Sequence, residues 1–203
     1  MRPATTGPDT EAGAPATVRS PLFMRVLGML ESRERPVVID LGSATPELLA
    51  RLGPMHARLE VIDLPRALEA WQEPPDAEQP GQHFIDWLLP PGPRPADAVL
   101  AWDLPNYMPL PVFGRLMREV ARRCRRGALL HMLATYAHSR MPARPGRYVP
   151  EGYDALHCAP ADAALIDAPR HSSEALDAAL QGMHMERAVL LRSGLQEMLF
   201  EVE

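Results

Sequence analysis

The chain has 203 residues, of which 46% are hydrophobic and 23% are charged, and its formal net charge is -5. This composition excludes a wholly disordered chain, and the length fits one domain with one sizeable core better than two. The negative charge offers no general attraction for nucleic acid or anionic lipid and so argues against either partner.

The first residues, MRPATTGPDTEAGAPATVRS, mix proline, glycine, alanine and threonine without a periodic apolar pattern. We therefore expect residues 1–19 to form a flexible leader and residues 20–203 to form a single domain. The leader lacks the apolar segment of a secretory signal, and no later apolar run reaches the length of a membrane span. These features predict a cytoplasmic protein. The two cysteines and seven histidines show no metal-ligand spacing, so no metal site is predicted.

Strands and helices alternate along most of the expected domain. Apolar periodicity predicts helices, in chain order, over 20–30, 46–53, 65–71 and 110–126, the last with Gly127 as its C-cap. Short apolar runs predict strands over 36–42, 59–64, 82–87, 97–102 and 128–133. This alternation implies right-handed crossovers and a parallel sheet with helices on both faces.

The end of the chain breaks the alternation. A short helix over 174–180 precedes strands over 185–192 and 195–202, which Ser193 and Gly194 join as a tight turn. The predicted fold is therefore α/β, with a mostly parallel seven-stranded sheet and a C-terminal antiparallel hairpin.

Four segments at the ends of the first four strands carry polar residues: VVIDLGSATPELL, VIDLP, FIDW and VLAWDLPNYMPL. Open α/β sheets bind ligands beyond the carboxyl ends of their strands, where the N–H groups of the first loop meet the ligand. Gly42 fits that loop. Asp63 ends the next strand, where a carboxylate can accept hydrogen bonds from both ribose hydroxyls. Gly42 and Asp63 should then lie on opposite sides of one nucleoside-sized crevice.

In this order, the segments resemble the class I S-adenosylmethionine-dependent methyltransferases, whose five parallel strands are followed by a helix and a closing antiparallel hairpin. The resemblance covers roughly residues 20–203 and implies a Rossmann-like methyltransferase fold with S-adenosylmethionine as cofactor. It implies cofactor binding by a set of residues at the strand ends, namely Asp40, Gly42, Ser43, Ala44, Asp63, Leu64, Asp86, Trp87 and Trp102.

Catalytic candidates come from two places. The resemblance puts Asp103 and Tyr107 near the methyl group, and His138 follows the fifth strand, in a segment that could reach substrate. Residues 134–171 form a long connection, which is typical of a lid, a binding loop or a locally disordered segment. In the family this region often shapes the acceptor pocket, which implies substrate recognition by its aromatic and basic residues, namely Tyr136, Arg140, Arg147, Tyr148 and Tyr153.

The loop after the first strand departs from the family, which carries further glycines where this chain has Ala44 and Pro46. If the backbone at position 44 needs a positive φ, a Cβ there costs roughly 1–2 kcal/mol. One hypothesis is methyl transfer to an unknown acceptor, with a small molecule preferred. Its alternative is a catalytically inactive methyltransferase-like module that binds a protein partner, and a homo-oligomer is also open.

A third hypothesis is a nicotinamide-dependent dehydrogenase. Its G-x-G-x-x-G fingerprint would fall on Gly42, Ala44 and Glu47, so two of the three glycines are missing. The terminal hairpin also argues against it, and it ranks last.

Overall fold

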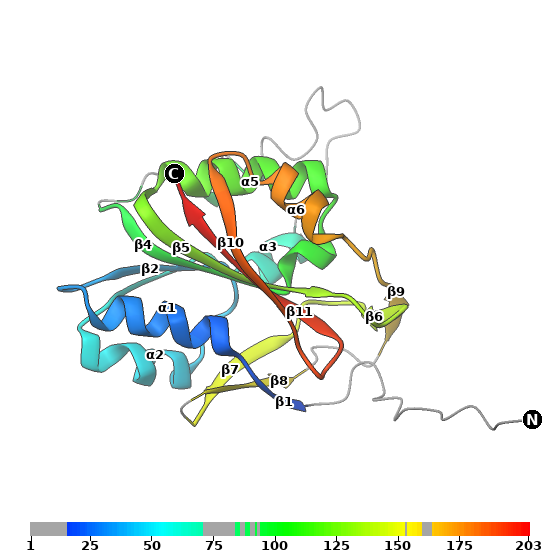
Figure 1. Ribbon diagram of the computed structural model, residues 1–203, viewed down its shortest axis with the longest axis horizontal. Helices are drawn as coiled ribbons and strands as arrows, with labels where there is room; N and C mark the ends of the chain where they lie inside the picture. The colour runs from blue at the N-terminus through cyan, green and yellow to red at the C-terminus, as the bar shows by residue number, and fades with distance from the viewer. Residues whose placement is uncertain are drawn as a thin grey trace, which may run out of the picture.

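The computed structural model describes residues 16–70, 84–85, 88–89, 92, 94–152, 154–159 and 164–203. The centre of this part of the chain is a six-stranded sheet with strand order β10-β11-β5-β4-β2-β3 (Figure 1). In chain order its strands are β2 Val37–Asp40, β3 Arg58–Val61, β4 Ala96–Trp102, β5 Cys124–Thr135, β10 Met183–Leu190 and β11 Leu195–Val202.

The directions of the strands confirm the predicted alternation and hairpin. β3, β2, β4 and β5 run parallel, whereas β11 pairs antiparallel with β5, and β10 pairs antiparallel with β11. Gly194, in the turn between β10 and β11, has a φ of +81°, a backbone conformation that glycine adopts without strain.

The predicted strand over 82–87 is wrong for the residues that the structure describes. Phe84, Ile85 and Leu88 are helical and buried in one apolar cluster. Their spacing places all three on one face of a helix, and a short apolar run cannot by itself distinguish a buried strand from a buried helical turn. The described sheet therefore has six strands and not the predicted seven.

Helices cover both faces of the sheet (Figure 1). On one face, α1 Pro21–Glu31 and α2 Pro46–Leu52 bury one apolar cluster. On the other face, α3 Leu64–Ala70, α5 Leu110–Arg122 and α6 Ser173–Ala179 bury a second cluster. None of the described helices is long and apolar enough to cross a membrane.

The junction between α5 and β5 corrects a second prediction. The helix ends at Arg122 with Arg123 as its C-cap, so Gly127 is not the cap, and residues 124–126 are strand. Gly127 has a φ of +75° inside β5, where the pairing with β4 shifts register. Arg125 pairs with buried Asp97 at 2.9 Å, a tertiary contact that the local helical pattern does not reveal.

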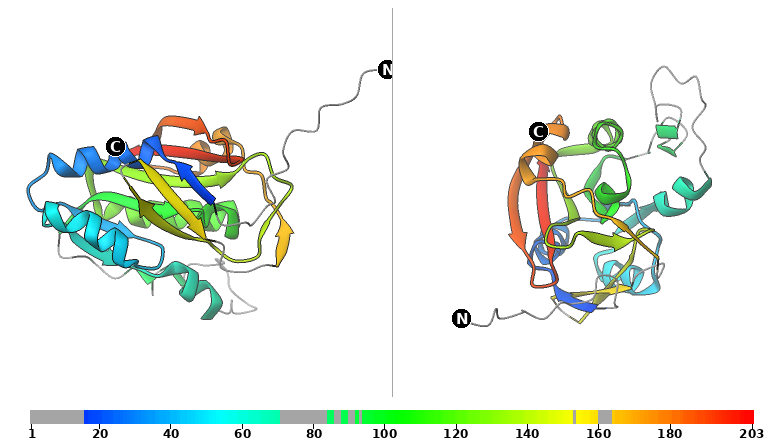
Figure 2. Two further views of the ribbon diagram at one scale, coloured as in Figure 1. Left: turned by 90° about the horizontal axis from the view of Figure 1, so that it is seen from below. Right: turned by 90° about the vertical axis from the view of Figure 1, so that its right-hand side faces the viewer.

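The segment after β5 forms two small sheets instead of an irregular connection. β6 Arg140–Pro142 pairs with β9 Leu165–Asp167, and β7 Arg147–Glu151 pairs with β8 Ala155–Ala159. β1 Ala16–Arg19 joins the free side of β8, beside the yellow strands in Figure 2. Residues 16–19 therefore form a strand inside the segment that was expected to be a flexible leader.

Candidate functional site

The carboxyl ends of β2, β3 and β4 open into a cavity of about 500 Å³, which we call the Gly42 crevice. This volume lies within the roughly 300–1,000 Å³ that is typical of small-molecule sites. The lining combines strand ends of the main sheet with residues of β7 and β8: Gly42, Ser43, Asp63, Pro65, Arg66, Glu69, Trp102, Pro145, Gly146, Arg147, Tyr148 and Ala159.

Gly42 and Asp63 line the same crevice, as the sequence predicts. The backbone N–H of Ile62 donates to the Asp40 carbonyl at 2.8 Å, which holds the end of β3 beside the end of β2. Across the crevice, the Ser43 hydroxyl donates to Asp63 Oδ1 at 2.7 Å. Asp63 has a φ of +51°, a left-handed conformation that aspartate tolerates better than most residues.

The altered glycine loop carries no left-handed strain at Ala44, which is not among the residues of positive φ. Pro46 is the first residue of α2, where its missing N–H costs nothing, and Thr45 Oγ1 accepts a hydrogen bond from Leu48 N at 3.2 Å. Ala44 is exposed and does not line the crevice. Leu64 does not line it either, because its side chain is buried in the core beneath α3.

Trp102 lies directly on the glycine loop. Its indole Nε1 donates to Asp40 Oδ1 at 2.6 Å, and the Gly42 N–H donates to the same oxygen at 2.9 Å. A Cβ placed on Gly42 would lie only 2.5 Å from Trp102 Cδ1, so the indole touches the loop backbone. Burial raises the pKa of Asp40, and the hydrogen bonds from Trp102 and Gly42 offset part of that rise.

Tyr148, from β7, covers Trp102 on its other side. The two rings are parallel within 2°, with centroids 5.7 Å apart. Asp103 anchors this cover, because its Oδ2 accepts a hydrogen bond from Gly146 N at 3.0 Å. Burial raises the pKa of Asp103 to about 6, although hydrogen bonding from Gly146, Tyr148 and Tyr107 partly offsets the rise.

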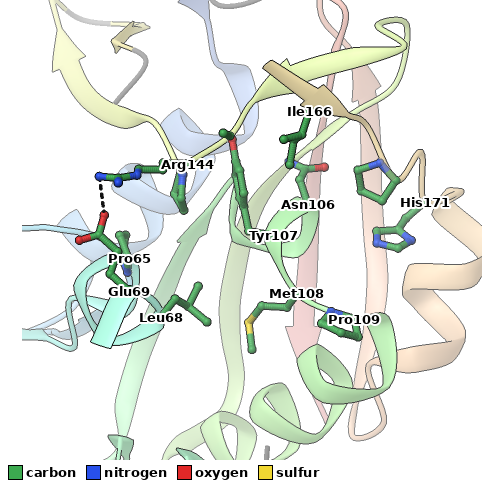
Figure 3. A pocket seen from close by; sticks show the side chains of 13 residues that line it. Pro65, Leu68, Glu69, Asn106, Tyr107, Met108, Pro109, Arg144, Ile166 and His171 are labelled. Atoms are coloured by element: carbon green, nitrogen blue, oxygen red, sulfur yellow. Dashed lines mark ion pairs between the residues drawn. The ribbon is translucent and has the colours of Figure 1, made fainter. Parts of the chain in front are cut away.

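A second cavity of about 490 Å³ adjoins the crevice, and we call it the Tyr107 pocket (Figure 3). Its lining is rich in proline and apolar side chains: Pro65, Leu68, Glu69, Asn106, Tyr107, Met108, Pro109, Ala143, Arg144, Pro145, Ile166, Pro169 and His171. Pro65, Glu69 and Pro145 line both cavities, so the two spaces are neighbours. Arg144 and Glu69 form an ion pair at 3.0 Å, drawn as the dashed line in Figure 3.

The short 3₁₀ helix Leu104–Tyr107 presents Tyr107 to this pocket. Asn106 holds it in place, since its Nδ2 donates to the Asp103 carbonyl at 2.8 Å and its Oδ1 accepts from Thr135 N at 2.9 Å. Burial, together with the Asp103 carboxylate, raises the pKa of Tyr107, so this phenol stays protonated.

Sequence reasoning missed His171, which lines the Tyr107 pocket. Its Nε2 is buried without a hydrogen-bond partner, and burial lowers the pKa of the ring. A lone histidine in a proline-rich stretch carries no local signal that would have identified it.

The remaining candidates lie elsewhere. His138 lines neither cavity, because its Nε2 lies 2.8 Å from the Ser193 carbonyl at the β10–β11 turn. Arg140 binds the Leu165 carbonyl, and Tyr136 is exposed. Asp86, Trp87 and Tyr153 lie outside the described residues. Within the described part of the chain, no three His, Cys, Asp or Glu side chains are grouped to hold a metal ion.

Comparisons with known proteins bear on the fold. No protein-family model and no curated protein sequence matches the chain. Among solved structures, an S-adenosylmethionine-dependent methyltransferase from Clostridium acetobutylicum is similar, with a TM-score of 0.53, 10% identity and 89% of each chain covered. The CcbJ methyltransferase from Streptomyces caelestis has a TM-score of 0.51 and 12% identity, over 89% of this chain and 88% of its own. The chain therefore has the Rossmann-like fold of the class I methyltransferases.

Proposed function

We propose that the chain is an S-adenosylmethionine-dependent methyltransferase that acts on a small-molecule acceptor. The observation that carries this proposal is the pair of adjoining cavities at the carboxyl edge of the sheet, one polar and one mostly apolar. The likeness of the fold to two methyltransferases supports it.

The Asp63 side of the Gly42 crevice fits an adenosyl cofactor. Asp63 and Ser43 together offer a carboxylate and a hydroxyl to a ribose diol, as acidic residues at this strand end do in nucleotide-binding sheets. The Gly42 side fits less well, because Trp102 occupies the space over the loop. When bound, S-adenosylmethionine supplies an electrophilic methyl group, and the part of the protein is to hold the acceptor in line with it.

The Tyr107 pocket is suited to an acceptor that is largely apolar and uncharged. Leu68, Met108 and Ile166 line it, and its two charged residues neutralise each other as an ion pair. Protonated Tyr107 can orient an acceptor oxygen or nitrogen by donating a hydrogen bond. His171, which burial keeps neutral, can accept a proton from the same group.

The decisive measurement is titration with S-adenosylhomocysteine, followed by calorimetry and by thermal unfolding. At a hundred times its dissociation constant, a true ligand should stabilise the fold by about 2.7 kcal/mol. Asp63→Asn keeps a residue that tolerates positive φ but loses the charge, and should weaken binding by about tenfold to a hundredfold. Asp167→Asn, an exposed control on β9, should leave the affinity unchanged. No stabilisation of the wild type at millimolar ligand would overturn the proposal.

The second candidate is the catalytically inactive module that binds a protein partner. The contact between the Trp102 indole and Gly42 favours it, since that contact fills part of the crevice. Failure of both the wild type and Trp102→Ala to bind S-adenosylmethionine or S-adenosylhomocysteine would select this candidate.

A further inference from the structure

The stacked rings of Trp102 and Tyr148 lie inside the space that a nucleoside ligand would use. A Cβ on Gly42 would also lie 2.7 Å from Trp102 Nε1, so nothing can enter between the loop and the indole unless the indole moves. Trp102 is 4% exposed and Tyr148 8% exposed, which shows how completely the two rings close this side.

The closed position of Trp102 carries backbone strain. Its φ is +49°, a left-handed conformation that costs a non-glycine residue roughly 1–2 kcal/mol. The bond to Asp40, the stack on Tyr148 and edge contacts with Phe23 and His131 offset that cost. Strained residues held only by their surroundings are common at ligand sites, because a ligand can replace the holding contacts.

Tyr148 reaches the crevice through a segment remote in sequence from Trp102. β7 carries it, and the bond from Gly146 N to Asp103 ties the start of that strand to the residue after Trp102. The two rings therefore open or close according to how the small β1-β8-β7 sheet is seated.

The two sides of the crevice differ in what they can accept. Asp63 and Ser43 on one side are the ribose ligands of the proposed function, on which this inference rests. In sheets of this type, the loop after the first strand meets the group attached beyond the ribose, at its 5′ carbon. Trp102 covers that loop.

We infer that Trp102 and Tyr148 determine which nucleosides the Gly42 crevice admits, by occupying the space needed for a substituent on the ribose 5′ carbon. Adenosine fits beside the closed rings. S-Adenosylhomocysteine, which carries an amino-acid arm at that carbon, must displace the indole and binds with the cost of doing so.

The test is calorimetric titration of adenosine and S-adenosylhomocysteine into the wild type, Trp102→Ala and Tyr148→Ala, with exposed Tyr136→Ala as the control. Either ring deletion should raise the affinity for S-adenosylhomocysteine by about tenfold, with less than about a threefold change for adenosine. Trp102→Phe, which shortens the ring and loses the Asp40 bond, tests the same direction if Trp102→Ala does not fold. Loss of affinity for both nucleosides would make Trp102 a binding platform and overturn the inference, while leaving the proposed function standing.

A ligand-free measurement keeps the two proposals separable. Gly42→Ala should push the indole away, which moves the Trp102 indole N–H signal in the NMR spectrum, assigned by its loss in Trp102→Phe. Gly28→Ala is the matched control, since its Cβ would meet nothing within 4 Å. An unmoved signal in Gly42→Ala would overturn the closed stack whatever the titrations give. If the signal moves but no variant binds either nucleoside, the proposed function fails and the selection by Trp102 fails with it.

Discussion

Two groups of buried carboxylates in this protein differ in how completely they are hydrogen-bonded. Glu197, on β11, is fully buried and accepts bonds from the Ser20 hydroxyl, from Leu22 N at 3.2 Å and from Phe23 N at 3.0 Å, and His131 Nε2 lies 2.8 Å away. Asp40 and Asp103, beside the Gly42 crevice, each keep one buried oxygen without a partner.

The pKa shifts follow this difference. Burial alone would raise the pKa of Glu197, but the hydrogen bond and charge of His131, with the bonds from Ser20 and Leu22, lower it. Burial raises the pKa of Asp40 and of Asp103 because fewer donors oppose it. A satisfied buried carboxylate stabilises a fold, whereas an incompletely satisfied one beside a cavity marks a candidate site.

Glu197 also explains how α1 begins. Ser20 makes no side-chain cap bond to the helix, and the Glu197 carboxylate accepts the free N–H groups of the first turn instead. A negative charge at a helix N-terminus also interacts favourably with the helix dipole. β11 and α1 are thereby locked together across the end of the sheet.

The largest expected effect is that of Glu197→Ala on stability. The substitution leaves His131 and the first N–H groups of α1 without a buried partner, so the free energy of unfolding should fall by about 3–5 kcal/mol. Denaturation in urea measures this. Partly exposed Glu201→Ala on the same strand should cost less than about 1 kcal/mol, and equal losses for the two variants would contradict the structural role of Glu197.

The dependence of stability on pH separates the two groups next. Asp103 has a folded pKa of about 6 against an ordinary value of 3.8. Between these values the folded state binds more protons at Asp103 than the unfolded state does, so its contribution to stability falls as pH rises through the window. Asp103→Asn should remove that fall, which is of the order of 2 kcal/mol.

Glu197 should act in the opposite direction. Because its folded pKa is lowered, its contribution is present above the ordinary value of 4.5 and is lost as pH falls below it. Urea midpoints measured from pH 3 to pH 8, roughly the range over which carboxylates titrate in proteins, should show Glu197→Gln flattening only the acid limb. A flattened limb above pH 4.5 in that variant would assign the two carboxylates wrongly.

The smallest expected effect is that of Ser20→Ala. Glu197 keeps its other three partners in this variant, so the loss of one hydrogen bond to a carboxylate should cost about 1–2 kcal/mol. Exposed Ser32→Ala, at the other end of α1, should cost less than about 0.5 kcal/mol. A loss as large as that of Glu197→Ala would mean that the cluster depends on Ser20 and not on redundancy.

Much of the fold could be predicted because its signals are local. The apolar stripe of α1 is buried as its helical spacing predicts, and the turn at Gly194 forms the predicted hairpin. The errors fell where local pattern is ambiguous or overridden. Phe84 and Ile85 suit a strand or a helical turn equally, and residues 124–126 leave the helix to pair with β4 and Asp97.

The candidate site divides in the same way. The sequence alone determined that Gly42 and Asp63 would meet at one edge, because parallel strands bring their carboxyl ends together. Asp103 and Tyr107 were also identifiable from their place after a strand. His171 and Tyr148 belong to a segment whose strands pair only with one another and with β1, so nothing local places them.

The order of strands and helices, the hairpin and the pairing of Gly42 with Asp63 were determined by the sequence itself, since hydrophobic period and turn residues act over a few positions. Only the tertiary structure decided that Trp102 fills the space above Gly42 under the ring of Tyr148. Such a contact depends on how segments far apart in the chain pack together, and no local pattern records it.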